Sequence, residues 1–122
     1  MMQFELPWPP STNRIWRNVV TRGRPQTLLS TEGRKFRTLA GHYCQLAGVA
    51  GKQLTGRLAV ELHVQAPDRR GRDLDNVLKA TLDALTHAGV WGDDSQIDRL
   101  VVTRGEITKG GKLLVSIEGA GA

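Results

Sequence analysis

The 122-residue sequence has one cysteine, few aromatic residues and no long hydrophobic run. The single Cys44 excludes an internal disulfide. It falls among the apolar positions of an expected helix, so we expect a core residue rather than a nucleophile. A membrane-spanning helix needs about 18 or more apolar residues, and no signal-peptide pattern opens the chain. We therefore expect no membrane span and a cytoplasmic protein.

Internal repeats, low-complexity tracts and interdomain linkers are also absent from the sequence. The length favours one domain, residues 1–122. The hydrophobic content of 39% and charged content of 24% are ordinary for a globular chain. The net charge of +5 favours an anionic partner, and nucleic acid is the first candidate.

The arginines are concentrated in two stretches of the chain, which we expect to contact DNA phosphates. One is a stretch without regular periodicity, and the other precedes an acidic pair. The first group comprises Arg14, Arg17, Arg22 and Arg24, and the second comprises Arg69, Arg70 and Arg72.

Four segments are expected to form strands, and the first two show the alternation of apolar and polar residues that is typical of them. They cover residues 2–6, 58–65, 97–104 and 112–118. A Gly-Gly pair lies between the last two segments, and such pairs favour tight turns. We therefore expect the last two strands to pair antiparallel.

Two segments show the 3.6-residue period of amphipathic helices. The first begins after Ser30, a favoured N-cap, and ends at Gly48 or Gly51. The second covers residues 74–88 and ends at Gly89. The order strand, helix, strand, helix, strand, strand predicts an α/β domain with a mixed sheet of about four strands and two main helices.

Residues 11–29 show no sustained periodicity, so we expect a long basic loop there. Trp8, just before this loop, is expected to pack on the sheet. Trp16 lies inside it among the arginines. The sequence leaves two roles open for Trp16, which either stacks on DNA bases or packs on the sheet.

Acidic pairs flank the second helix, with Asp73 and Asp75 at its start and Asp93 and Asp94 after its end. Residues two apart within a helix point roughly 200° apart. If Asp73 is still extended, however, the first two carboxylates converge. Converging carboxylates favour a hard divalent cation such as Mg²⁺ or Mn²⁺. Beside the basic run, such a metal indicates a phosphate substrate and a metallonuclease.

Ordinary structural roles also account for each of these features. Asp at a helix start is usually a cap. Asp75 and Lys79 have the i, i+4 spacing of a helix ion pair, which contributes about 0.2–0.5 kcal/mol. Asp93 and Asp94 after Gly92 suit a polar turn. On spacing alone, both interpretations stand.

The segment DRRGRDLDNVLKATLDALTHAGVWGDDSQID resembles the RusA family of Holliday-junction resolvases. The most specific part is D-L-D-N-x-x-K, followed by D-A-L and W-x-D-D. The opening LPWPPSTNRIWR and the closing ITKGGKLLVSI resemble the family's terminal signatures. The resemblance implies that Asp73, Asp75 and Asp94 are the catalytic carboxylates that hold the metal. It also implies that Lys79 is the functional lysine and that the protein is a homodimer.

Together with the acidic pairs, the resemblance implies an endodeoxyribonuclease that uses Mg²⁺, for which Mn²⁺ substitutes, and no small-molecule cofactor. The expected substrate is a four-way DNA junction, cut by paired nicks in opposed strands in DNA recombination and repair. Two alternatives are a non-catalytic DNA-binding module and a small-molecule phosphohydrolase. The basic loop argues against the phosphohydrolase, and the resemblance argues against both.

Overall fold

A computed structural model describes residues 1–120 of the chain, with the exception of the side chains of residues 12 and 13. The elements are, in order, β1 (Met2–Pro7), α1 (Thr12–Ile15), β2 (Trp16–Thr21), β3 (Arg24–Leu29), α2 (Thr31–Leu46), β4 (Leu58–Gln65), the 3₁₀ turn η1 (Leu74–Val77), α3 (Leu78–His87), the 3₁₀ turn η2 (Asp94–Gln96), β5 (Ile97–Arg104) and β6 (Lys112–Gly119). No helix in this part of the chain has the length and apolarity needed to cross a bilayer.

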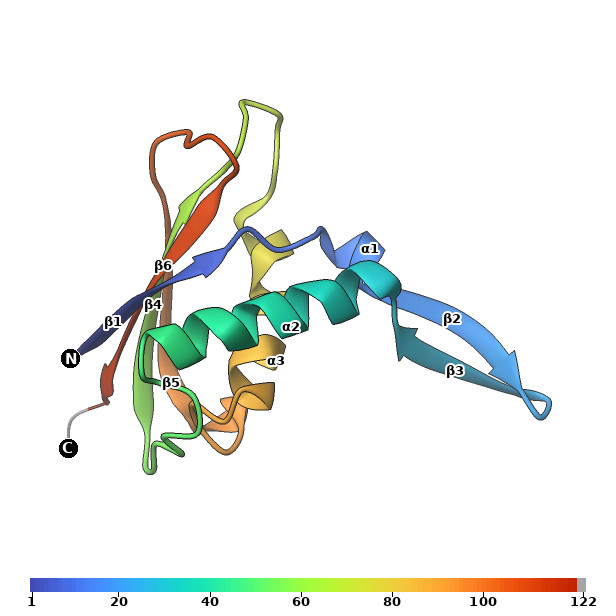
Figure 1. The fold of residues 1–122 in the computed structure, drawn as a ribbon, viewed down its shortest axis with the longest axis horizontal. Helices are drawn as coiled ribbons and strands as arrows, with labels where there is room; N and C mark the ends of the chain where they lie inside the picture. The colour runs from blue at the N-terminus through green and yellow to red at the C-terminus, as the bar shows by residue number, and fades with distance from the viewer. Residues whose placement is uncertain (121–122) are drawn as a thin grey trace.

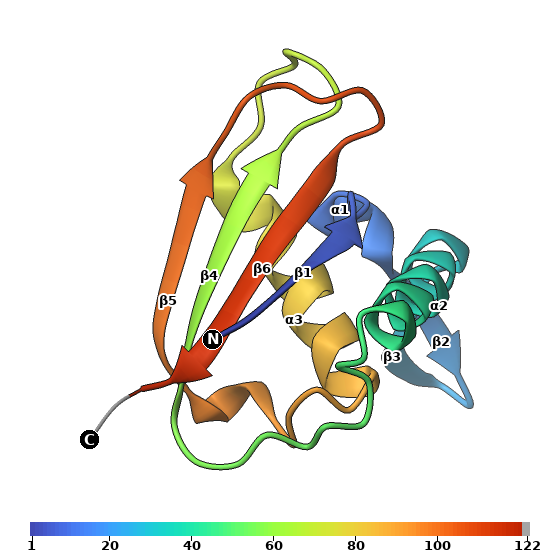
Figure 2. The same ribbon diagram turned by 60° about the vertical axis from the view of Figure 1, so that its left-hand side comes forward.

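The main sheet has four strands in the order β1-β6-β4-β5. Strands β4 and β5 run parallel, whereas β6 is antiparallel to both of its neighbours. Helices α2 and α3 lie on the same face of this sheet (Figures 1 and 2). The expected α/β architecture, with a mixed four-stranded sheet and two main helices, is confirmed.

The expected antiparallel pairing of the last two strands is wrong, because β4 lies between β5 and β6. Gly110 and Gly111 do form a turn, with φ of 81° and 71°. That turn belongs to a connection passing over the end of β4 (Figure 2). Helix α3 separates β4 from β5 in the chain, and a helical crossover returns the next strand parallel to the first. Strand β5 therefore pairs with β4.

The expected basic loop contains a second, two-stranded sheet that the sequence did not predict. Strands β2 and β3 pair antiparallel and form an arm, residues 16–29, that projects from the body (Figure 1). Its two turn residues, Arg22 and Gly23, both have positive φ, at 53° and 75°, as a type I′ hairpin turn requires. Most of its side chains are exposed, so no apolar face gives it a period in the sequence.

The root of the arm is fastened to the start of α2. Ser30 caps this helix as predicted, because its Oγ accepts a hydrogen bond from the Gly33 amide at 3.0 Å. The Ser30 amide donates to the Ile15 carbonyl oxygen at 2.7 Å, and its hydroxyl donates to the Arg14 carbonyl oxygen. Since Ile15 is buried in the core, these bonds join the arm to the body.

The hydrophobic core lies between the sheet and the two main helices. Cys44 on α2 is fully buried in it, which confirms the expected core role. Burial raises the pKa of its thiol to about 11, so the thiol is protonated at neutral pH. Trp91 is also fully buried, and its indole N–H donates to the Thr86 hydroxyl at 2.7 Å.

Gly33→Ala tests how closely α2 packs on the arm root. A Cβ at this position would lie 2.7 Å from the Ile15 carbonyl oxygen and 2.8 Å from Leu29 Cδ1. We expect a loss of roughly 1–3 kcal/mol in the free energy of unfolding, as for other overpacked sites. The matched control is Gly41→Ala on the same helix, where a Cβ meets nothing within 4 Å. It should stabilise by up to about 1 kcal/mol. Urea unfolding measures both, and equal effects would contradict the packing argument.

Candidate active site

The candidate site is built on a loop, residues 66–73, that leaves the end of β4 and leads into η1. Asp73 ends this loop in an extended conformation, with φ of −82° and ψ of 140°, which is the condition under which the sequence allows the first two carboxylates to converge. It is the N-cap residue of η1, yet its side chain makes no capping hydrogen bond. Capping therefore does not account for Asp73. Asp75 follows in the first turn of η1.

The helix ion pair between Asp75 and Lys79 is not formed in the described chain. Instead, the Lys79 ammonium nitrogen lies 5.3 Å from the centre of the Trp16 ring. Trp16, the first residue of the arm, is partly buried and packs against the core. Its indole N–H is buried, with no hydrogen-bond partner within residues 1–120. In this structure Trp16 packs on the body and contacts the lysine.

Asp93 and Asp94, the second acidic pair, differ in their contacts. The Asp93 carboxylate accepts a hydrogen bond from the Ser95 amide at 3.2 Å, and Gln96 Oε1 accepts one from the Asp93 amide at 3.0 Å. The hydrogen bonds from Ser95 lower the pKa of Asp93. Asp93 therefore caps η2, a structural role in a polar turn. Asp94 begins η2, which packs against α3.

The three expected metal ligands, Asp73, Asp75 and Asp94, do not form a ready-made site. Across residues 1–120, no three Asp, Glu, His or Cys side chains gather closely enough to hold one metal ion. The donor chemistry nevertheless suits Mg²⁺. This ion usually keeps several waters and takes one or two carboxylates plus substrate phosphate oxygens. Asp73 and Asp75, at the start of one helix, supply two carboxylates of the required kind.

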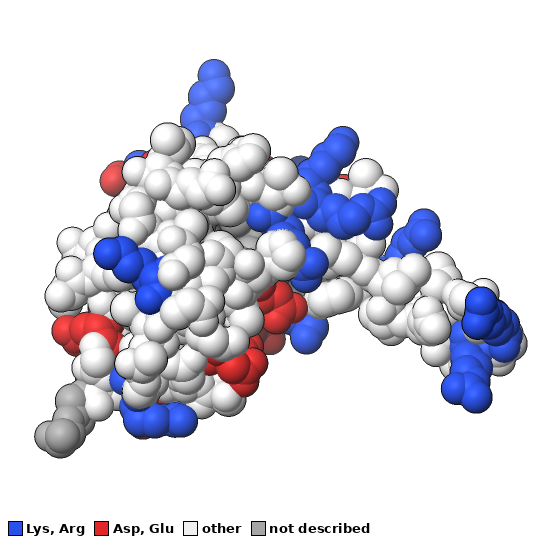
Figure 3. Space-filling view, turned by 60° about the horizontal axis from the view of Figure 1, so that its bottom comes forward, with Lys and Arg blue, Asp and Glu red and all other residues white. Residues whose placement is uncertain are grey.

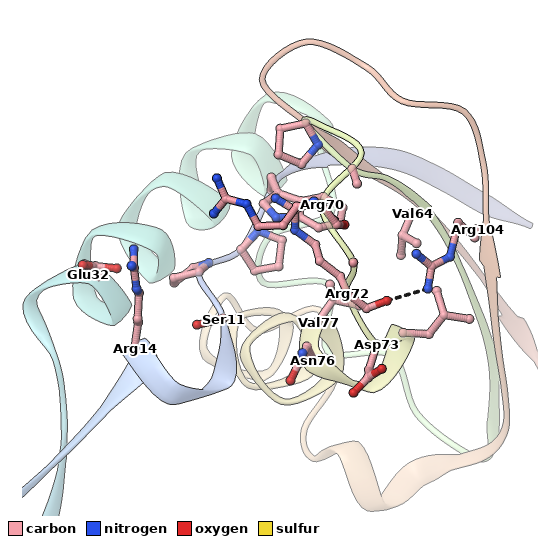
Figure 4. Close-up of a pocket in the computed structure, with 17 residues that line it drawn as sticks. Ser11, Arg14, Glu32, Val64, Arg70, Arg72, Asp73, Asn76, Val77 and Arg104 are labelled. Atoms are coloured by element: carbon pink, nitrogen blue, oxygen red, sulfur yellow. Dashed lines mark hydrogen bonds between the residues drawn. The ribbon is translucent and has the colours of Figure 1, made fainter.

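A cavity of about 380 Å³ opens beside Asp73 (Figure 4). Its walls come from the proline-rich turn after β1, the starts of α1 and α2, the loop of residues 66–73, η1 and the end of β5. Four arginines line it, and two of these were expected from the basic run before Asp73. The four are Arg14, Arg70, Arg72 and Arg104.

Arg72 has several partners within the protein. Its Nη1 donates to the Asp68 carboxylate at 2.8 Å, and its guanidinium lies 5.8 Å from the centre of the Trp8 ring. The Arg72 carbonyl oxygen accepts a hydrogen bond from Arg104 Nη2 at 2.7 Å. These contacts fix the backbone next to Asp73. Trp8 packs against the core, as expected.

Asp68 and Arg104 are site residues that the sequence analysis missed. The hydrogen bond from Arg72, followed by one from the Arg70 amide, lowers the pKa of Asp68 to about 2. Asp68 is therefore ionised at neutral pH and holds Arg72 in place. Its i, i+4 spacing from Arg72 was a usable signal. No local signal marks Arg104, because its position depends on the parallel pairing of β5 with β4.

The remaining predicted DNA contacts lie on the surface. Arg17, Arg22 and Arg24 are exposed along the arm, and Figure 3 shows basic side chains gathered at its far end. Arg14 is exposed at the root of the arm, and Arg69 is exposed on the loop of residues 66–73. The structure thus divides the expected basic surface between the arm and the cavity beside Asp73.

Carboxylates and arginines around one cavity define a site suited to phosphate chemistry, and sequence comparison identifies the class. Residues 7–118 match the family described as Endodeoxyribonuclease RusA. Proteins named Crossover junction endodeoxyribonuclease RusA from Escherichia coli K12 and Shigella sonnei are 43% identical over 113 residues. A phage 82 relative of the same name is 42% identical over 113 residues. Each alignment covers 92% of this chain and 89% of the relative. The chain belongs to the RusA family of endodeoxyribonucleases.

Proposed function

We propose that this enzyme resolves four-way (Holliday) DNA junctions by metal-dependent paired nicks in opposed strands, in DNA recombination and repair. The observation that carries the proposal is Asp73, extended and unused as a cap, in an arginine-lined cavity, with Asp75 two residues later in the first turn of η1. The names of relatives that align with 92% of the chain support the choice of substrate. DNA as substrate favours the cytoplasm as the compartment.

We propose Mg²⁺ as the metal, with Asp73, Asp75 and Asp94 as the carboxylates that hold it. Mn²⁺ is expected to substitute, because it takes the same oxygen ligands. When bound, the metal supplies a Lewis acid and an activated water for phosphodiester hydrolysis. Asp94 enters this set through the family resemblance.

Lys79 is proposed to stabilise the charge that develops on the scissile phosphate. It lies one helical turn after Asp75, and it is not neutralised by an ion pair within the described chain. An ammonium at this position donates to a non-bridging oxygen as negative charge grows in the transition state. The contact with Trp16 holds this ammonium near the root of the arm.

The basic residues are proposed to bind the DNA duplexes that meet at the junction. The major groove of DNA admits a two-stranded ribbon, which suits the exposed arm of residues 16–29. Loss of one phosphate contact flattens the slope of log Kd against log salt concentration by about one unit. Alanine substitution of each arginine therefore tests whether that arginine contacts a phosphate. The proposed phosphate contacts are Arg14, Arg17, Arg22, Arg24, Arg69, Arg70 and Arg72. Trp16, at the root of the arm, is proposed as a further DNA contact, through stacking on a base.

Replacing each proposed ligand separately tests the metal assignment. Asp73→Asn, Asp75→Asn and Asp94→Asn each remove a charge and keep the shape. We expect a loss of cleavage larger than the roughly 10- to 100-fold typical of outer-shell partners of a metal, with junction affinity kept or raised. The measurement is single-turnover cleavage of a mobile four-way junction at saturating Mg²⁺. Asp93→Asn is the matched control and should have a milder effect, because Asp93 caps η2.

The same assay separates the proposal from its alternatives when linear duplex and a phosphomonoester are included, each with and without Mg²⁺. A DNA-binding module would bind the junction without cutting it, and a phosphohydrolase would release phosphate from the monoester. Wild-type cutting by any of the three Asn variants would remove that residue from the site.

Lys79 and Trp16 form a pair whose coupling is measurable. Lys79→Ala should lower the single-turnover rate by on the order of 10² to 10³. Trp16→Leu removes a cation–π contact of about 0.5–1 kcal/mol and should lower the rate about 2- to 5-fold. Trp16→Phe, which keeps an aromatic face, should retain most of the rate. In the Lys79→Ala background, Trp16→Leu should change nothing further. Fully independent losses would show that the contact does not position the lysine.

We further propose that the enzyme acts as a homodimer. A four-way junction has approximate twofold symmetry and needs cuts in two opposed strands, whereas one chain carries one set of acids. A C₂ dimer places two identical sites about the axis of the junction. Light scattering should give twice the 13.4 kDa mass of the chain. The monomer mass at all working concentrations, with and without junction, would contradict the proposal. A dimer with one Asp75→Asn subunit should nick one strand.

A further inference from the structure

We propose that the cavity beside Asp73 binds one unstacked nucleotide of the DNA strand that is cut. The inference rests on the proposed junction-cutting function, because Asp73 belongs to the same site. Its size suits the ligand, since the volume of about 380 Å³ falls within the range of roughly 300–1,000 Å³ found for small-molecule pockets. One wall is apolar and suits the base of a nucleotide, and the opposite rim carries arginines that suit its phosphate.

One wall of the cavity is apolar and rigid. It includes Pro9, Pro10 and Pro67 together with Val64 and Val77. The two valines are buried, and proline rings are held by their fixed backbone angle. Every base has an apolar face, and removing that face from water against apolar side chains is favourable whatever the base. This wall is therefore the place for the base.

Trp8 also lines the cavity, but its side chain already contacts two other residues. Arg72 lies over the ring, and Gly111 packs against its Cβ and Cγ, where an added Cβ on the glycine would approach to 2.9 Å. Trp8 thus supports the wall by holding Arg72, and the base is expected to lie against the prolines.

Two arginines on the opposite rim supply the positive charge that binds a phosphate. Arg14 and Arg70 are exposed, and within residues 1–120 neither guanidinium has a hydrogen bond or ion pair. In this they differ from Arg72 and Arg104, which bond within the protein. In Figure 4, Arg14 and Arg70 lie on one side of the cavity and Asp73 on the other. A strand whose scissile phosphate lies at Asp73 would bring a neighbouring phosphate to the two arginines.

Glu32 favours a nucleotide over a bare phosphate. It lines the cavity and lies beside Arg14 in Figure 4. A carboxylate accepts hydrogen bonds from the N–H groups on base edges and repels a second phosphate. The branch point of a junction is where a nucleotide is most easily supplied, because unstacking costs least where pairing is already disturbed.

Fluorescence of 2-aminopurine, which brightens when the base is unstacked, tests the inference. The base is placed singly at each position flanking the scissile phosphate of a four-way junction, and saturating protein is added in EDTA to prevent cutting. We expect a rise of about threefold or more at one position. Arg14→Ala and Arg70→Ala should lose most of this rise. The matched control is Lys35→Ala, because Lys35 is an exposed cation on α2 that neither lines the cavity nor belongs to the proposed DNA contacts. It should keep the rise at saturation.

A second measurement changes the DNA and needs no protein variant. An abasic site at the brightening position should weaken binding by about tenfold, the scale set by burying one base face on an apolar wall, and abasic sites elsewhere should not. The inference is overturned if no position brightens, or if Arg70→Ala brightens fully at saturation. Cleavage of the same junction in Mg²⁺ by the same wild-type preparation separates the two proposals. Cutting without brightening defeats the pocket alone, whereas binding without cutting defeats the proposed nuclease function.

Discussion

The parallel pairing of β4 with β5 is the constraint on which the site depends. Because α3 forms the crossover between these strands, both end at the same edge of the sheet. Arg104, the last residue of β5, then lies within reach of the loop that leaves β4 and donates to the Arg72 carbonyl oxygen. The backbone before Asp73 is thereby fixed from a strand some thirty residues further along the chain.

The loop of residues 66–73 has no regular structure of its own, yet side-chain contacts hold it. Asp68 binds Arg72, and Arg72 lies over Trp8. Trp8 in turn packs against Gly111 of the β5–β6 connection. Three distant segments therefore set the position at which Asp73 enters η1. A loop held in this way presents the Arg70 guanidinium and the Asp73 carboxylate on a rigid scaffold, which suits a site that orients a phosphodiester.

Local signals in the sequence determined the elements that build the body. Ser30 caps α2 and Gly89, at φ of 75°, follows the end of α3, because capping depends on residues within one turn. The apolar stripe placed Cys44 in the core. Spacing placed Asp73 at the junction with the helix, where the structure has it as the N-cap residue of η1. Each of these features depends on neighbouring residues, so pattern and residue chemistry were enough to predict them.

Only the tertiary structure decided which elements meet. The arm escaped prediction because its exposed strands bury no periodic face, and Arg22-Gly23 is a weaker turn signal than Asn-Gly. Gly110-Gly111 suggested a hairpin, but the crossover through α3 placed β4 between the two strands. The contact of Trp16 with Lys79 joins residues more than sixty positions apart. Such contacts are set by chain topology and packing, which no local pattern in the sequence records.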